Sequence, residues 1–402
     1  MDSRLYWIWL QQALPLGCTI MGELLDRFGH AEALYRADKT ALRDGGISDK
    51  YVKRLADKSL DTARRILDRT LEQGGWVLTP EDALYPLSLR QSTGCPAALY
   101  CCGSMPNLDS IPAVAVVGTR SASAAGIREA YSLSAGLAAG GMVVVSGGAK
   151  GIDAAAHTGA LDGQGRTIMV MACPLDVNYP KENDALRKRT LAEGGLLLSE
   201  YAVGEPYRCD FHIRNRLLAG LAQGVCLGET PTRSGALISA RLAREQGRDV
   251  FAMPGSLTGH LYDGAHREIQ RGATLVMRAT DILREYAPLF PGMLDLEAAE
   301  ETQKKLEHVT PRAEKAAKPR RDKKTVSVPP VQPSAPAPSA IIPDTASEAA
   351  KRVFAALTDT PRPVDELAGE VDLPIPNLLA ALTELEMLGC AENSAGQQYK
   401  KQ

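Results

Sequence analysis

The sequence has no long hydrophobic run, no paired-cysteine motif and almost no net charge. No apolar stretch is long enough to span a bilayer, and the one near the start, residues 5–10, is too short for a signal peptide. The eight cysteines form no C-x-x-C pair and no His-Cys ligand spacing, so we expect reduced thiols in a cytoplasmic protein without metal or cofactor. A net charge of −2 excludes a global attraction to nucleic acid, so any polyanion site must be a local patch.

Changes in composition divide the 402 residues into four predicted segments. Residues 1–75 are predicted to form a small helical domain, in which Gly46-Ile47-Ser48 resembles a SAM or helix-hairpin-helix turn. Such a turn would either contact a DNA phosphate or serve a helix bundle structurally, and we favour the bundle. Residues 76–298 alternate between apolar runs and helical stretches, which predicts an α/β fold with a mostly parallel sheet covered on both faces.

The last two predicted segments are a linker and a small domain. Residues 299–344 are rich in Lys, Arg, Ala and Pro, which indicates a solvated linker, although its basic run could also contact a nucleic-acid backbone. Residues 345–402 show three helices followed by a possible hairpin, the order of a winged-helix-like domain. The third helix has no Lys or Arg, so we expect it to contact protein rather than to read a DNA groove.

Two glycine-rich turns follow two predicted strands and form a βαβ unit with a helix at residues 124–139. Strand carboxyl ends that open helices present backbone N–H groups, which bind phosphates. Neither turn has the G-x-G-x-x-G or G-x-x-x-x-G-K-[ST] pattern, and the glycines could merely permit tight turns. The residues expected to contact phosphate here are Gly118, Thr119, Arg120, Ser146, Gly147, Gly148, Lys150, Gly151 and Asp153.

A second cluster combines an aromatic ring, two guanidinium groups and an amide. Its members are Phe211, Arg214, Asn215 and Arg216. Arginine forks suit phosphates and an aromatic face suits an unstacked base, so the cluster favours a polyanion site. The alternative is that Phe211 is a core residue and that an arginine pairs with Glu200 or Glu229. A third turn, with Ser234 and Gly235, again precedes a predicted helix.

Six motifs, in order between residues 76 and 283, resemble the DNA-processing protein DprA (Smf) family. They occupy residues 116–120, 146–157, 179–183, 211–216, 234–241 and 250–256. The resemblance implies an extended Rossmann-like domain that binds single-stranded DNA without strong sequence preference. It also implies a homodimer that loads the recombinase RecA during natural transformation, without catalysis. The glycine-rich turns, the stacking aromatic and the R-N-R sequence of the family match the residues named above.

The chain departs from the family pattern at two places. His212 and Ile213 stand where Pro and a basic residue are common, and His266 and Glu268 stand where the family often has Asn and Leu. The second departure leaves open what the segment around residue 264 contributes to the site.

Two other classes of function compete with DNA binding. The turn at residues 146–151 also resembles that of Rossmann-type nucleotide phosphoribohydrolases, but no Glu follows the turn at residues 232–237 to act at a sugar carbon. A protein-interaction scaffold that acts through the last domain would not explain the arginines and glycines at one sheet edge. No membrane partner is expected.

Overall fold

The computed structural model describes residues 2–311 and 347–401, apart from residues 359, 361, 372, 388–389 and 395–397. The chain divides into a large unit, Met1–Pro319, and a small unit, Arg320–Gln402. In these described ranges, no helix has both the length and the apolar character that crossing a membrane requires.

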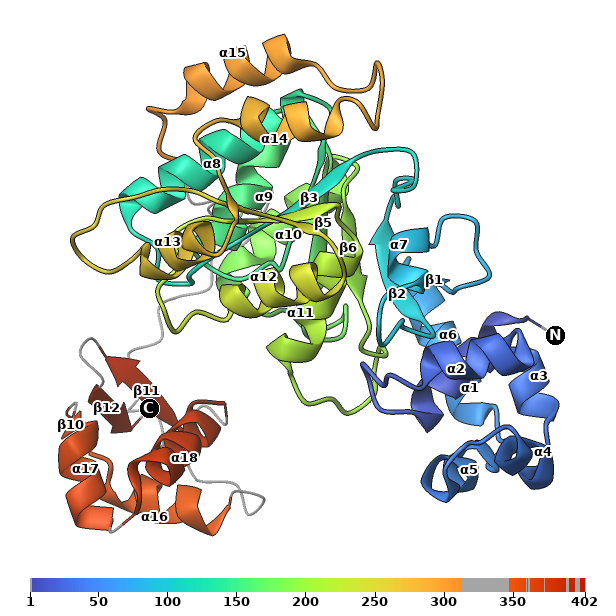
Figure 1. The fold of residues 1–402 in the computed structure, drawn as a ribbon. Helices are drawn as coiled ribbons and strands as arrows, with labels where there is room; N and C mark the ends of the chain where they lie inside the picture. Colours follow the sequence, from blue (N-terminus) through green and yellow to red (C-terminus); the bar gives the residue numbers. More distant parts are fainter. Residues whose placement is uncertain are drawn as a thin grey trace, which may run out of the picture. The chain divides into compact units, whose positions relative to one another are not determined.

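A nine-stranded sheet forms the centre of the large unit (Figure 1), in the order β1-β2-β6-β5-β4-β3-β7-β8-β9. All pairs from β6 to β9 are parallel, as the sequence predicts, whereas β1 and β2 form an antiparallel edge. The strands are β1 (Trp76–Leu78), β2 (Leu99–Gly103), β3 (Ala113–Val117), β4 (Val143–Ser146), β5 (Thr167–Met171), β6 (Leu196–Ser199), β7 (Gly224–Leu227), β8 (Asp249–Ala252) and β9 (Thr274–Leu275).

Helices cover both faces of the sheet because both faces of its central strands are apolar. Val114 and Val116 of β3 pack beneath α8, α9 and α14, while Ala115 and Val117 pack beneath α11 and α12 (Figure 1). The helices of this region are α7 (Leu87–Arg90), α8 (Ala124–Ala139), α9 (Ile152–Asp162), η1 (Lys181–Asn183), α10 (Asp184–Ala192), α11 (Phe211–Gly220), α12 (Ala236–Glu245), α13 (Asp263–Gln270), α14 (Ala279–Tyr286) and α15 (Leu296–Leu306).

The strand order reverses beside β3. The chain passes outward from β3 through β4 and β5 to β6, then returns to place β7 on the other side of β3. The helices after β3 and β7, α8 and α12, therefore lie on opposite faces of the sheet. In open parallel sheets such a reversal leaves a crevice at the carboxyl ends of the two strands, where ligands bind.

The first 75 residues form helices, as predicted, but they share one core with the antiparallel edge of the sheet. The side-chain amide of Gln11 donates to the carbonyl oxygens of Ala98 (2.9 Å) and Glu200 (2.8 Å), which ties the first helix to β2 and β6. The packing therefore continues across the predicted domain boundary at residue 75. The helices are α1 (Arg4–Ala13), α2 (Met21–Phe28), α3 (Ala31–Arg36), α4 (Lys39–Asp44), α5 (Asp49–Leu55) and α6 (Asp61–Glu72).

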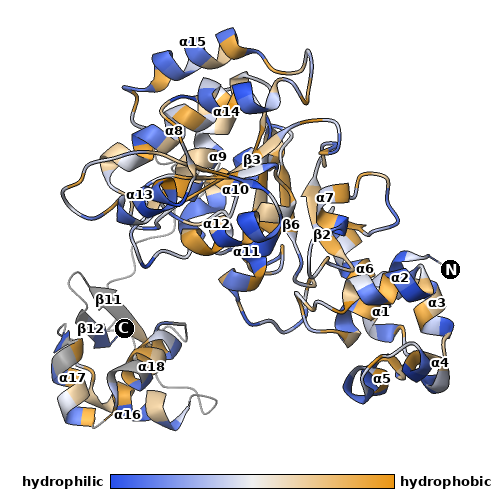
Figure 2. Cartoon of the chain, in the orientation of Figure 1, coloured by the Kyte–Doolittle hydropathy of each residue, from blue (hydrophilic) through white to orange (hydrophobic). Residues whose placement is uncertain are grey.

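The predicted linker boundary at residue 299 is wrong, because α15 runs through that position. Leu296, Ala299 and Leu306 recur on one face of this helix and pack on the α8 side of the sheet, with Ala299 fully buried. Figure 2 shows the matching alternation of hydrophilic and hydrophobic residues along α15. Residues 312–344 of the predicted linker lie outside the described residues.

The small unit confirms the predicted winged-helix order. Three helices, α16 (Glu348–Ala356), α17 (Val364–Val371) and α18 (Ile375–Met387), precede the strand pair β11 (Ala391–Ser394) and β12 (Gln398–Lys401). A short strand, β10 (Arg362–Pro363), pairs with β12. The unit has its own apolar core, in which Val353, Leu367 and Leu382 are buried, as expected of a domain that folds on its own.

His157 of α9 makes the large unit sensitive to acid. Its ring is fully buried, and Nδ1 lies 2.7 Å from the hydroxyl of Thr167, which itself donates to the carbonyl oxygen of Val144. Burial lowers the pKa of His157 to about 3, below the ordinary 6.5. The folded state therefore resists a proton that the unfolded chain accepts, and the stabilisation present above pH 6.5 is lost as the pH falls toward 3.

We expect the free energy of unfolding to drop by up to about 1.4 kcal/mol for each pH unit through this group as the pH falls below 6. Urea unfolding of the wild type and of His157→Gln between pH 7 and 4.5 measures it. The variant should show the shallower pH dependence, and equal slopes would contradict a neutral buried imidazole.

Candidate nucleic-acid interface

Three turns meet at the crevice beside β3. The first turn (residues 118–121) follows β3, the second (147–151) follows β4 and the third (231–235) follows β7. Together with the start of α11 they line a hollow of about 290 Å³, and a neighbouring hollow of about 220 Å³ lies between the second turn and Tyr179. Arg120, Ala149 and Phe211 line both. Gly118, Thr119, Ser234 and Gly235 line the larger hollow, while Gly147, Gly148 and Lys150 line the smaller.

Arg120 and Phe211 form the centre of the site. The guanidinium of Arg120 lies over the Phe211 ring, 4.0 Å from its centroid. The ring is half-buried and does not belong to the hydrophobic core, so the alternative that Phe211 is a core residue is wrong. Tyr179 places a second aromatic ring 6.3 Å from Phe211 and is 45% exposed. Tyr179 belongs to the family motif at residues 179–183, but its sequence context alone does not predict a ring at the site.

The segment after Asp210 is helical, which changes the roles of Arg214 and Asn215. Asp210 caps α11, and its carboxylate accepts from the amides of His212 (2.8 Å) and Ile213 (3.2 Å). Arg214 is buried and donates to the carbonyl oxygens of Gly147 and Val170. Asn215 donates to the carbonyl oxygen of Gly235 (3.2 Å). These two side chains therefore brace the second and third turns from beneath.

Arg216 does not join the other residues of its motif. Two residues along a helix is a rotation of about 200°, so Arg216 points away from Arg214. Its guanidinium is buried against the carboxylate of Glu200, and burial raises the pKa of that carboxyl group. The alternative of a structural pair with Glu200 is confirmed, and Arg216 is excluded from direct contact with a phosphate.

Protein carboxylates occupy backbone N–H groups that the sequence predicts to be free. At the start of α8, the carboxylate of Glu229 accepts from the amide (2.8 Å) and hydroxyl (2.9 Å) of Ser123. At the start of α9, Asp153 accepts from the amide of Ala149 (3.4 Å), and burial raises its pKa. Carboxylates of the protein itself thus occupy part of the two helix N-termini. An anion would therefore be bound mainly by the side chains at the rim of the hollow.

Two rim arginines are available for such an anion. Arg120 and Arg233 are exposed and line the larger hollow. In the described part of the chain, no ion pair engages either of them, whereas Lys150 pairs with Glu182. Arg233 is a site residue that sequence reasoning missed, although its position beside Ser234-Gly235 in a strand-to-helix turn was a usable signal.

The glycines of the second turn allow backbone conformations and close contacts that other residues would not. Gly148 and Gly151 have positive φ angles of 68° and 75°, and a Cβ at Gly151 would overlap the carbonyl oxygen of Thr119 in the first turn. The hydroxyl of Ser146 donates to the carbonyl oxygen of Val116 at 2.7 Å. These contacts hold the first two turns close together, as the tight-turn alternative requires.

His266 and Glu268, the two residues of α13 that depart from the family pattern, both bond to other parts of the protein. The carboxylate of Glu268 is buried and pairs with Arg244 and Arg271. His266 Nε2 accepts from the amide of Gly255 at 3.2 Å. Neither residue lines the two hollows; His266 holds the loop after β8, and Glu268 joins α13 to α12.

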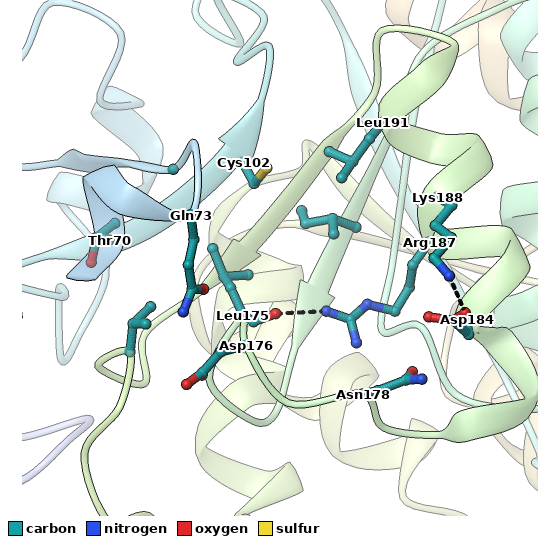
Figure 3. Close-up of a pocket in the computed structure, with 13 residues that line it drawn as sticks. Thr70, Gln73, Cys102, Leu175, Asp176, Asn178, Asp184, Arg187, Lys188 and Leu191 are labelled. Atoms are coloured by element: carbon teal, nitrogen blue, oxygen red, sulfur yellow. Dashed lines mark hydrogen bonds and ion pairs between the residues drawn. The ribbon is translucent and has the colours of Figure 1, made fainter.

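Figure 3 shows another pocket, between α6, β2 and α10. Two of its basic side chains bond to other groups of the protein. Arg187 donates to the carbonyl oxygen of Leu175 (2.8 Å) and Lys188 pairs with Asp184 (2.6 Å). Across the described ranges, no three His, Cys, Asp or Glu side chains are grouped as metal ligands.

Comparison with known proteins assigns the family. The chain belongs to the family of DNA recombination-mediator protein A, whose profile matches residues 76–287, and residues 332–397 match the DprA winged helix domain. The resemblance expected from the six motifs is thereby confirmed.

The chain is similar to several individual proteins and solved structures. The chain is 31% identical over 417 residues to Protein Smf from Synechocystis sp., covering 100% of this chain and 99% of that protein. The X-ray structure of DNA processing protein A from Streptococcus pneumoniae superimposes with a TM-score of 0.59 and 34% identity, over 70% of this chain and 97% of that one. A structure of the Helicobacter pylori protein, titled for its single-stranded DNA binding mode, matches with a TM-score of 0.47 and 32% identity, over 53% and 96% of the two chains.

Proposed function

We propose that this protein binds single-stranded DNA without strong sequence preference, through Arg120, Arg233, Phe211 and the turns around them. The observation that carries the proposal is the half-buried Phe211 ring with the Arg120 guanidinium 4.0 Å from its centroid. Arg233 lines the same hollow, and no ion pair among the described residues engages either arginine. A single strand offers phosphates and free base faces together, whereas a duplex hides its base faces. Stacking on a ring requires no base-edge code, so affinity depends little on sequence.

Family membership supports a wider role for the protein. We propose that it acts in the cytoplasm as a homodimer that loads RecA on the bound strand during DNA uptake and recombination. Residues 1–75, the Rossmann-like segment and the winged-helix unit are the proposed modules, with the boundary after the Rossmann-like segment moved beyond α15.

We propose that the protein binds DNA without catalysing a reaction, because the two carboxylates near the turns are buried and hydrogen-bonded within the protein. Glycosidic cleavage needs an accessible carboxylate at the sugar carbon. Glu229 is 1% exposed and accepts from Ser123. Asp153 lines the larger hollow but is only 5% exposed, and it accepts from the amide of Ala149. This arrangement disfavours the phosphoribohydrolase alternative, and a scaffold function alone leaves the rim arginines without a role.

Arg120→Ala and Phe211→Ala should weaken binding in different ways. Loss of the Phe211 ring should cost about 1–3 kcal/mol with little change in salt dependence. Loss of Arg120 should lower affinity and also reduce the slope of log K against log salt by about 0.7. Gel shifts with oligothymidylate and a matched duplex at several salt concentrations measure both effects.

The control is Arg64→Ala on α6, which removes an exposed arginine remote from the turns. It should leave affinity and slope unchanged. Equal affinity of the wild type for single strands and duplex, or a flat salt response, would overturn the proposal. Thermal melting of Phe211→Ala separates lost stacking from lost stability.

A further inference from the structure

The segment that connects β6 to α11 is held in place by the helical N-terminal region. This connecting segment, residues 200–210, contains no helix or strand. On α6, Arg65 donates to the carboxylate of Glu205 at 2.8 Å, and Arg69 donates to the carbonyl oxygen of Gly204 at 2.7 Å. Two arginines one helical turn apart therefore bond to neighbouring residues in the middle of the connecting segment.

The contact with α6 is closely packed. Although it belongs to a surface segment, the side chain of Glu205 is only 18% exposed, and Arg69 also lies 3.9 Å from its carboxylate. A Cβ at Gly204 would overlap the guanidinium of Arg69. From the other side, the carboxylate of Asp176 in the loop after β5 accepts from the amide of Gly204 at 3.2 Å. The middle of the connecting segment is thus fixed from two directions.

The end of the connecting segment leads directly into the strand-binding site. Its last residue, Asp210, caps α11, and Phe211 is the first residue of that helix. The hydroxyl of Tyr201 accepts from the amide of Asp210 at 3.0 Å, and the ring of Tyr207 packs edge-on against Tyr201. Within the part of the chain that the structure describes, residues 206–209 make no hydrogen bond or ion pair. The start of α11 therefore depends on a stretch that is held mainly at its two ends.

We infer that Arg65 and Arg69 are positioning residues for the strand-binding site. They hold the middle of the connecting segment, and through it they keep Asp210 and Phe211 in place. The inference rests on the proposed function. No residue of α6 lines either hollow, so the helical N-terminal region contributes to strand binding through the connecting segment alone. Such coupling needs a continuous chain of contacts, which these bonds provide.

Glu205→Gln separates this positioning role from simple electrostatics. The substitution keeps the shape of the side chain and removes one negative charge, so electrostatic attraction alone would strengthen the binding of a polyanion. Loss of the contact with α6 should instead weaken the binding of oligothymidylate about two- to fivefold, as expected from the loss of an ion pair near the surface. Gel shifts of the full chain at one fixed salt concentration measure the difference.

Arg65→Ala and Arg64→Ala form a matched pair on α6. Both arginines are exposed, but the guanidinium of Arg64 makes no hydrogen bond or ion pair to any described residue. Each substitution removes one positive charge from the same helix. Arg65→Ala should weaken oligothymidylate binding about two- to fivefold, and Arg64→Ala should leave it unchanged. Equal losses would show that only the charge of α6 matters.

A double variant tests whether the effect passes through Phe211. In the Phe211→Ala background, Glu205→Gln should cause no further loss of affinity, because the ring that it positions is already gone. Without DNA, the amides of residues 206–213 should exchange hydrogen faster in Glu205→Gln than in the wild type, at an unchanged melting temperature. A contact that serves only stability would lower the melting temperature and would add its loss to that of Phe211→Ala.

Unchanged or tighter strand binding by Glu205→Gln would overturn the inference. Equal losses in the α6 pair, independent losses in the double variant, or unchanged hydrogen exchange would overturn it as well. In each of these cases the wild type still binds oligothymidylate, so the proposed function stands. If the wild type itself fails to bind oligothymidylate, the proposed function is wrong, and the wild-type gel shift alone reports this.

Discussion

Gly159→Ala is expected to destabilise the large unit by about 3 kcal/mol or more. Gly159 of α9 faces α8, and an added Cβ would overlap the carbonyl oxygen of Tyr131, with Gly163 in the same relation to Ala135. The obstacle is backbone, so the two helices must separate. Overpacking of this kind typically costs about 1–3 kcal/mol, and here separation also stretches the 2.6 Å hydrogen bond from Tyr131 to Asp162.

Gly22→Ala in α2 is the matched control. No atom lies within 4 Å of the added Cβ, and the position is helical, so the change should stabilise the protein by about 0.5–1 kcal/mol. Urea unfolding followed by circular dichroism measures both variants. Similar midpoints for the two would show that α8 and α9 are not in close contact.

Arg216→Met should cost about 3–5 kcal/mol, because it leaves the Glu200 carboxylate buried without its cation. The amide of Gly17 also donates to this carboxylate, so the pair joins α11 to the loop between α1 and α2. The double variant Arg216→Met, Glu200→Leu removes both charges and should recover most of the loss, since two Arg216 nitrogens already lack partners among the described residues.

Equilibrium unfolding at pH 7 compares the two single variants with the double variant. A single substitution that costs less than about 1 kcal/mol would place the pair in solvent rather than in the interior. Oligothymidylate affinity of the double variant should stay near that of the wild type, because Arg216 lies away from the turns. A large loss in a fully folded double variant would return Arg216 to the interface.

The local pattern of apolar residues and glycines in the sequence was enough to locate most strands and helices of the large unit. Apolar runs ending in glycine predicted β3 and β4, and the helix between them has the predicted limits. The limits of α15 could not be predicted in this way, because its apolar residues are few. They form a recognisable face only through their contact with Gly136 of α8 and with Gly140, which follows that helix. The antiparallel edge β1-β2 likewise depends on a partner strand, β6, remote in sequence.

The sequence by itself determined the family, the α/β fold and the convergence of three turns at one sheet edge, since strand period and strand-to-helix turns are local properties. Only the tertiary structure decided which members of the site face outward. Helical rotation turned Arg216 toward Glu200 while Phe211 remained beside Arg120. Glu229, from a later turn, took the amide of Ser123 at the start of α8. Partners so distant in sequence are brought together only by packing, and they determine whether a charge is neutralised within the fold or left for a ligand.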